Sequence, residues 1–151
     1  MMPAWIILTA CTSKSSAGRL VEGFTSTRGI VPLLIKGDPL ICTDMICASR
    51  TFLTIDNHGT ESPLSSYTGT YPLGRSGRIT ITAMNEMTIS WTSDVDVYCI
   101  FIKGGAGGNS YRYDPPSRSD SGLSTPVDTG HGKPNAFGTI TICYGAPAAD
   151  R

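Results

Sequence analysis

The residue types of a hydrolytic triad occur together in this 151-residue chain, in one stretch towards its C-terminal end. Asp128 and His131 lie three positions apart, and Ser121 or Ser124 could supply the nucleophile. A working triad needs its members fixed by separate elements of the fold, whereas nothing within a single stretch rich in Gly, Ser and Pro fixes their mutual geometry. We therefore expect solvated turn residues here, no catalytic residues, and a protein that is not an enzyme.

Metal and cofactor sites find little support in the spacing of the other polar residues. The aspartates that could bind calcium are Asp94, Asp96, Asp114, Asp120 and Asp128. Their spacing matches no EF-hand or repeat-type calcium loop, so a single calcium within residues 114–128 is the lesser alternative. The glycine cluster at 104–108 lacks the last glycine of a dinucleotide-binding motif, and Pro134 stands where a P-loop needs a hydroxyl. We expect no metal and no cofactor.

The charge of the chain argues against nucleic acid and anionic membranes as partners. Twelve basic and twelve acidic side chains balance, and the isoelectric point is near 6.7. This balance leaves no overall field to attract polyanions. Only 16% of the residues are charged, so the surface must be polar largely through Ser and Thr hydroxyls, which is common in secreted β-rich proteins.

The cysteines indicate an oxidising compartment. There are five, none in C-x-x-C spacing: Cys11, Cys42, Cys47, Cys99 and Cys143. An odd number cannot pair completely within one chain, so two bridges with one thiol left over, or one bridge between chains, are the oxidised outcomes. Any one of them could instead be a small buried apolar side chain. The spacing alone does not choose the pairing.

The chain reads as a succession of short β-strands. Val95–Ile102 contains six apolar or aromatic residues in a row and ends at a glycine cluster, which predicts a central strand covered on both faces. Clean alternation in Arg78–Ala83 and Met87–Trp91 predicts a hairpin with one buried face and Trp91 in the core. Residues 114–135 read as a long loop. The other predicted strands are Leu20–Phe24, Gly29–Ile35, Leu40–Cys47, Thr51–Ile55, Ser66–Tyr71, Ser110–Tyr113 and Ala136–Tyr144.

This pattern predicts an all-β fold, an antiparallel β-sandwich of the immunoglobulin-like or jelly-roll-like kind, with an N-terminal extension strand. Residues 20–151 would form the sandwich, with Ile140–Ile142 beside or opposite the central strand. Residues 1–19 would form a donor-type strand and its linker. No window shows a sustained helical period.

Residues Met1–Cys11 are largely apolar at both the odd and the even positions, so a strand formed here would be apolar on both faces. This stretch lacks the basic start of a signal peptide, and it is too short for a transmembrane helix. Leu8–Cys11 matches a lipobox, but the apolar lead is short. The remaining interpretation is a β-strand buried on both faces, followed by the flexible linker Thr12–Arg19. The side chains expected at a subunit interface are Ala4, Trp5, Ile6, Ile7, Leu8, Thr9 and Ala10.

Several short motifs follow one another in order between Arg78 and Tyr144. They are Ile89-Ser90-Trp91-Thr92-Ser93, Lys103-Gly104-Gly105, Tyr111-Arg112-Tyr113-Asp114-Pro115, Asp120-Ser121-Gly122-Leu123-Ser124-Thr125-Pro126, Gly132-Lys133-Pro134 and Ile142-Cys143-Tyr144. In these motifs the chain resembles a recurrent, functionally uncharacterised domain of extracellular and surface proteins. It departs from that family at Gly138-Thr139, where a Ser-His pair is usual, and at Cys99. The resemblance implies a secreted β-sandwich with an adhesive or structural role and no catalytic residues.

The cysteine count, the low charge and the resemblance together predict an extracellular or cell-surface protein, with a disulfide from Cys143 to a cysteine in Leu40–Cys47. In organisation the chain is also similar to subunits of extracellular fibres that exchange strands. We expect a filament subunit that polymerises with itself head to tail through its N-terminal strand, which could instead pack within its own domain. The alternative is a secreted carbohydrate-binding or adhesive module, with glycans stacking on Tyr67, Tyr71, Tyr111 and Tyr113.

Overall fold

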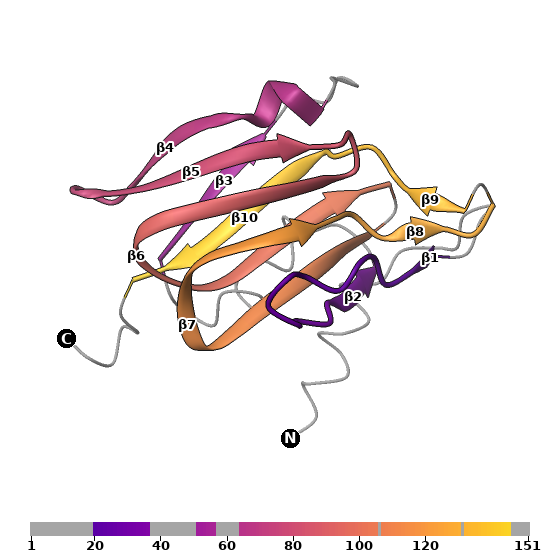
Figure 1. The fold of residues 1–151 in the computed structure, drawn as a ribbon, viewed down its shortest axis with the longest axis horizontal. Helices are drawn as coiled ribbons and strands as arrows, with labels where there is room; N and C mark the ends of the chain where they lie inside the picture. The colour runs from indigo at the N-terminus through magenta and orange to yellow at the C-terminus, as the bar shows by residue number, and fades with distance from the viewer. Residues whose placement is uncertain (1–19, 37–50, 57–63, 106, 131, 146–151) are drawn as a thin grey trace.

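The computed structural model describes residues 20–36, 51–56, 64–105, 107–130 and 132–145 (Figure 1). The expected donor strand and linker, the predicted strand Leu40–Cys47 and the two histidines, His58 and His131, lie outside the described residues. The strands are β1 (Leu20–Val21), β2 (Leu33–Lys36), β3 (Thr51–Asp56), β4 (Gly69–Leu73), β5 (Gly77–Met84), β6 (Thr88–Gly104), β7 (Gly107–Leu123), β8 (Val127–Asp128), β9 (Lys133–Pro134) and β10 (Thr139–Tyr144), with a 3-10 turn, η1 (Leu64–Tyr67), before β4.

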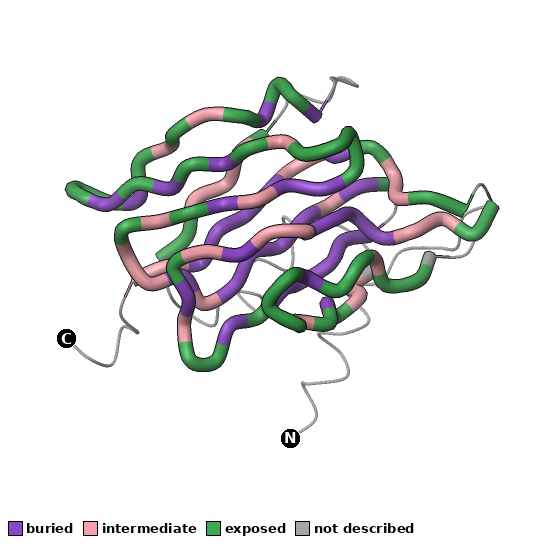
Figure 2. The backbone as a smooth tube through the Cα atoms, viewed as in Figure 1, coloured by how far each residue is buried: buried purple, intermediate pink, exposed green. Residues whose placement is uncertain are grey.

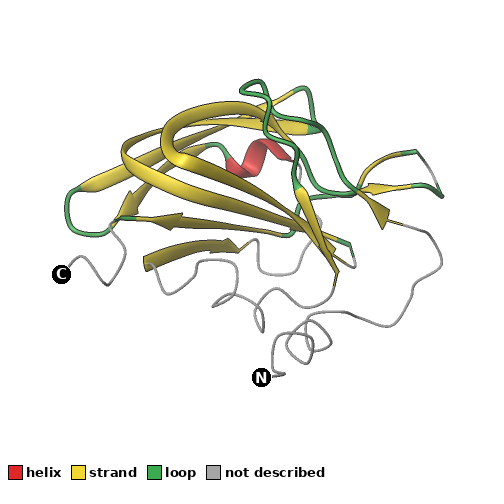
Figure 3. Ribbon diagram, turned by 90° about the horizontal axis from the view of Figure 1, so that it is seen from below, coloured by secondary structure: helices red, strands yellow, loops and turns green. Residues whose placement is uncertain are grey.

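A long hairpin, β6 and β7, organises the fold. Each strand has 17 residues, and the register between them shifts at a bend between Thr92 and Val97. Before the bend β6 pairs with β5, which carries β4; after the bend it pairs with β10, which carries β3. The first residues of β7 pair with β2. Figure 3 shows the long strands curving through this bend.

The fold is all-β and antiparallel, as the sequence predicts. The bend divides the main sheet into two halves that share one apolar cluster, so the architecture is an open sandwich. The predicted central strand is confirmed, because β6 lies between β7 and β10, with Ile140 opposite Ile102 and Ile142 opposite Ile100.

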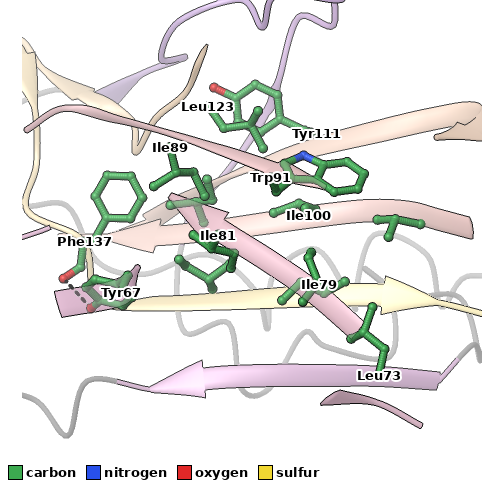
Figure 4. Packing of buried hydrophobic residues seen from close by; sticks show 14 of the residues in the cluster. Tyr67, Leu73, Ile79, Ile81, Ile89, Trp91, Ile100, Tyr111, Leu123 and Phe137 are labelled. Atoms are coloured by element: carbon green, nitrogen blue, oxygen red, sulfur yellow. Dashed lines mark hydrogen bonds between the residues drawn. The ribbon is translucent and has the colours of Figure 1, made fainter. Parts of the chain in front are cut away.

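The core comes from alternate residues on both halves, and the buried positions follow the middle of the strands (Figure 2). Ile81 of β5 lies opposite Trp91 of β6. Ile79 and Ile89 are buried with them in the same apolar cluster, and all four are at most 1% exposed (Figure 4). The predicted hairpin is therefore confirmed. Met87 is the exception, because it lies in the turn and is 36% exposed.

The long loop predicted for residues 114–135 is wrong over its first ten residues. β7 continues to Leu123, which is buried, although Pro115 and Pro116 interrupt the sequence pattern. Both prolines lie between Arg112 and Ser117, where β7 has no residue in register with β6. A proline there removes no ladder hydrogen bond, so the strand tolerates it.

Candidate functional site

The candidate site is an edge of the main sheet, and one other edge of that sheet is already covered by the chain. The second part of β7 lies at an edge, but residues 24–30 run beside it. The backbone N–H of Thr27 donates to the carbonyl of Ser121 at 2.8 Å, and Arg28 Nε donates to the carbonyl of Ser119 at 2.6 Å. This edge is therefore closed by the chain itself.

A buried carboxylate secures that closure. Asp120 is 6% exposed and accepts from the backbone N–H of Arg28 at 3.1 Å and of Ser121 at 2.8 Å. Its other oxygen accepts from the Tyr113 hydroxyl at 2.9 Å, and that hydroxyl accepts from Trp91 Nε1 at 3.3 Å. Burial and the nearby carboxylate raise the pKa of Tyr113. The network thus joins β6 and β7 to the segment that covers this edge.

The edges at β2 and β4 are poor sites for another strand. β2 has four residues. β4 contains Pro72, which has no N–H to donate. Short strands and prolines are common means of protecting sheet edges from pairing.

The β3 edge lacks these protections. β3 has six residues without a proline, and within the described part of the chain it pairs only with β10. Leu53 and Ile55 point inward, are partly exposed and pack against the core. On the opposite face Phe52 is 45% exposed. The inner face of this edge is thus apolar, and its outer face carries the exposed Phe52 beside the polar Thr54 and Asp56. An apolar strand could pair here, with one set of its side chains against Leu53 and Ile55 and the other against Phe52.

Three of the four tyrosines of the predicted glycan platform face inward, which is a correction to that prediction. Tyr67, Tyr111 and Tyr113 are at most 3% exposed, and Tyr71 is half-buried against the core. Tyr67 donates to the carbonyls of Phe137 and Gly138 at 3.1 and 2.6 Å, and burial raises its pKa to about 12 (Figure 4). Tyr111 donates to the carbonyl of Phe24 at 2.7 Å, and Tyr71 to that of Tyr67 at 2.7 Å. Tyr67, Tyr111 and Tyr113 are therefore covered, and Tyr71 alone of the four keeps part of its side chain exposed.

Ser124 and Asp128, two of the residues considered above for a hydrolytic triad, form hydrogen bonds with the backbone. Ser124 Oγ donates to the carbonyl of Thr125 at 2.9 Å and accepts from the N–H of Phe24 at 2.9 Å. Asp128 accepts from the N–H of Gly130 at 2.7 Å, within its own turn. In the described ranges no three acidic, His or Cys side chains gather as a metal site would require. Asp96 instead pairs with Arg118 at 3.0 Å.

Two of the five cysteines lie on the described strands, and they are neighbours. Cys143 of β10 is disulfide-bonded, and Cys99 of β6 is a buried free thiol directly opposite it. The other three cysteines lie outside the described residues, so the predicted pairing with Leu40–Cys47 stays a prediction.

One cleft, of about 590 Å³, was not foreseen in the sequence. It lies where the β5–β6 turn meets η1 and the chain before β10. Leu64 and Phe137 are buried in its lining, and Asn85 and Glu86 stand exposed at it. Glu86 has a φ of 67°, a conformation that costs a residue with a Cβ.

Comparison of the chain with protein-family models, curated proteins and solved structures gave no match. The family resemblance between Arg78 and Tyr144 therefore stays a prediction. Among the helices of the described segments, none has the length and apolar character needed to cross a membrane.

Proposed function

We propose that this protein is a structural subunit of an extracellular filament, and that subunits join when the N-terminal strand of one pairs with the β3 edge of the next. The observation that carries the proposal is the β3 edge itself, which is six residues long, free of proline, apolar on its inner face and marked by the exposed Phe52 on its outer face. Main-chain hydrogen bonds to such an edge provide affinity, and alternate side chains provide specificity.

The N-terminal sequence complements this edge. Residues 4–10 are apolar at both parities, so one set of side chains would meet the core beside Leu53 and Ile55 while the other set meets Phe52. The linker Thr12–Arg19 has eight residues and spans up to about 26–29 Å when extended. This reach carries the strand to a neighbouring subunit. Because donor and edge are different surfaces, each contact leaves another donor and edge unused, and the chain of contacts grows as a fibre.

The extracellular setting is supported by chemistry. The described chain carries a disulfide at Cys143, and disulfides persist mainly in oxidising compartments. The low charge and hydroxyl-rich composition agree with that setting.

Deleting Met1–Cys11 tests the proposal. We expect the full chain to form fibres visible by negative-stain microscopy and the deleted chain to sediment as a monomer. A synthetic peptide of residues 1–11 should bind the deleted chain and leave it monomeric, because the peptide fills the edge without carrying an edge of its own. Fibres that persist after the deletion would refute strand exchange, and a full chain that stays monomeric would favour packing of the strand within its own domain.

A carbohydrate-binding module is the second candidate, and the cleft beside the β5–β6 turn favours it. Its volume of about 590 Å³ is in the range of small-molecule sites, and Asn85 and Glu86 offer polar groups to hydroxyls. A glycan array should then show binding that Glu86→Gln weakens, whereas an array without binding removes this candidate.

A further inference from the structure

The free thiol of Cys99 lies beside a disulfide. Cys99 of β6 and Cys143 of β10 are register partners in adjacent antiparallel strands, and both side chains belong to a small buried cluster with Phe101, separate from the main core. Cys143 is disulfide-bonded, whereas Cys99 is free and 3% exposed. A nucleophile and a bond it can attack are thus adjacent on one face of the sheet.

We propose that Cys99 is an internal nucleophile for thiol–disulfide exchange at Cys143. The Cys99 thiolate attacks Sγ of Cys143, the Cys99–Cys143 bond forms, and the bond from Cys143 to its present partner breaks. The electron pair of the broken bond leaves with that partner as a thiolate, which then takes up the proton given up by Cys99. One disulfide replaces another, so the step needs no oxidant or reductant.

The strand geometry permits the product. Directly opposed residues of antiparallel strands have Cα atoms about 4.5–5.5 Å apart, which is inside the range that a disulfide spans. The register also shifts between Cys143 and Tyr144, so the ladder is irregular next to the reacting bond. The attack therefore requires side-chain rotation and no rearrangement of the sheet.

The surroundings of Cys99 restrain the reaction in the native protein. Burial raises the pKa of its thiol to about 11, against the lowering effects of the Ser110 hydroxyl, 3.1 Å from Sγ, and of Arg112, its register partner on β7. Little thiolate forms at neutral pH, so exchange should be slow until the face opens. With an odd number of cysteines at least one thiol stays unpaired within the chain, and in the described strands that thiol is Cys99. Its attack releases the present partner of Cys143 as a free thiol, which can then form a bond elsewhere.

Peptide mapping without reduction tests the proposal on the full chain. Trypsin should place Cys99 in Ile79–Lys103 and Cys143 in Ser119–Arg151, with Cys11 in Met1–Lys14 and both Cys42 and Cys47 in Gly37–Arg50. The chain is held in alkaline buffer with urea below its unfolding midpoint, quenched with acid, alkylated and digested. We expect the Ile79–Lys103 peptide to become linked to Ser119–Arg151 while the original link to Cys143 declines, at a rate independent of protein concentration.

Two variants distinguish the effect of the Cys99 thiol itself from the effect of the residues around it. Cys99→Ser should abolish the new link and slow loss of the original one on the order of tenfold, because the attacking sulfur is gone. Ser110→Ala is the matched control and should still exchange, because it removes only a hydrogen bond to the thiol. Equal loss of the original link in Cys99→Ser, alkylation of Cys99 without the new link, or a rate proportional to protein concentration would each overturn the proposal.

Discussion

Asp120 shows how one side chain ties distant parts of the chain together. Its buried carboxylate accepts from Tyr113 and from the backbone N–H of Arg28 and Ser121. In Asp120→Ala these three donors lose their acceptor in a site with little water, so we expect the free energy of unfolding to fall by about 2–4 kcal/mol. Urea denaturation followed by circular dichroism measures the change.

The control for this prediction is Asp94→Ala. Asp94 also accepts from a backbone N–H, that of Arg78 at 2.7 Å, but it is exposed, so water can replace it and the loss should stay below about 1 kcal/mol. Equal losses in the two variants would show that burial of the Asp120 network does not matter.

Glu86 is the residue whose backbone opposes its type. At a φ of 67° glycine avoids the clash that a Cβ makes, so Glu86→Gly should raise the free energy of unfolding by about 0.5–1 kcal/mol despite the greater freedom of the unfolded chain. Glu86→Ala keeps the Cβ and should gain nothing. If both variants gain equally in thermal denaturation, the backbone conformation is not the cause.

At the scale of elements, alternation predicted the β5–β6 hairpin well because each strand has one buried face. Ile79, Ile81, Ile89 and Trp91 follow that rule. β7 was predicted too short because Pro115 and Pro116 usually end a strand, and only the register with β6 shows that the ladder is already interrupted there. Local sequence carries no information on that register.

The tyrosines and the edge were harder to predict, since both depend on contacts between distant residues. Tyr111 is buried, and its hydroxyl donates a hydrogen bond to the carbonyl of Phe24, 87 residues away in the sequence. Likewise, nothing within Thr51–Asp56 indicates that this strand is the last in the sheet among the strands that the structure describes. Its position follows from the pairing of β10 with both β6 and β3. The sequence could therefore suggest a donor strand, but it gave no indication of the edge that we propose as its acceptor.

The β3 edge itself can be blocked. Phe52→Lys places a charge on the outer face of the edge, where the side chain is already 45% exposed, so the fold should persist while strand addition and fibre formation are lost. The matched control is Leu33→Lys on β2 at the other end of the same half-sheet, where the side chain is 54% exposed. Microscopy should show fibres for Leu33→Lys only; fibres from both variants would exclude β3 as the acceptor.

For the whole molecule, buried hydroxyl and thiol groups predict sensitivity to alkali. Burial raises the pKa of Cys99 from 9.0 to about 11 and that of Tyr67 from 10.0 to about 12. The folded state holds these protons more tightly than the unfolded chain does. Their contribution to stability is therefore complete below about pH 9 and is lost as the pH rises through about 11 to 12.

The midpoint of urea unfolding should accordingly fall as the pH is raised from about 8 to about 11. The unfolding midpoint of Cys99→Ser should fall less steeply with pH, because this variant lacks one of the groups that ionise on unfolding. A midpoint that does not change over this range would contradict the burial of these groups.

Strand exchange between subunits is tested most directly by photo-crosslinking from position 52. Phe52 is replaced by a photoreactive phenylalanine in a mixture of isotopically heavy and light full-length chains, which is irradiated after assembly and digested with trypsin. Strand exchange at the β3 edge predicts crosslinks from Thr51–Arg75 of a heavy chain to Met1–Lys14 of a light chain, and the reverse. Crosslinks confined to single chains, heavy to heavy and light to light, would contradict it.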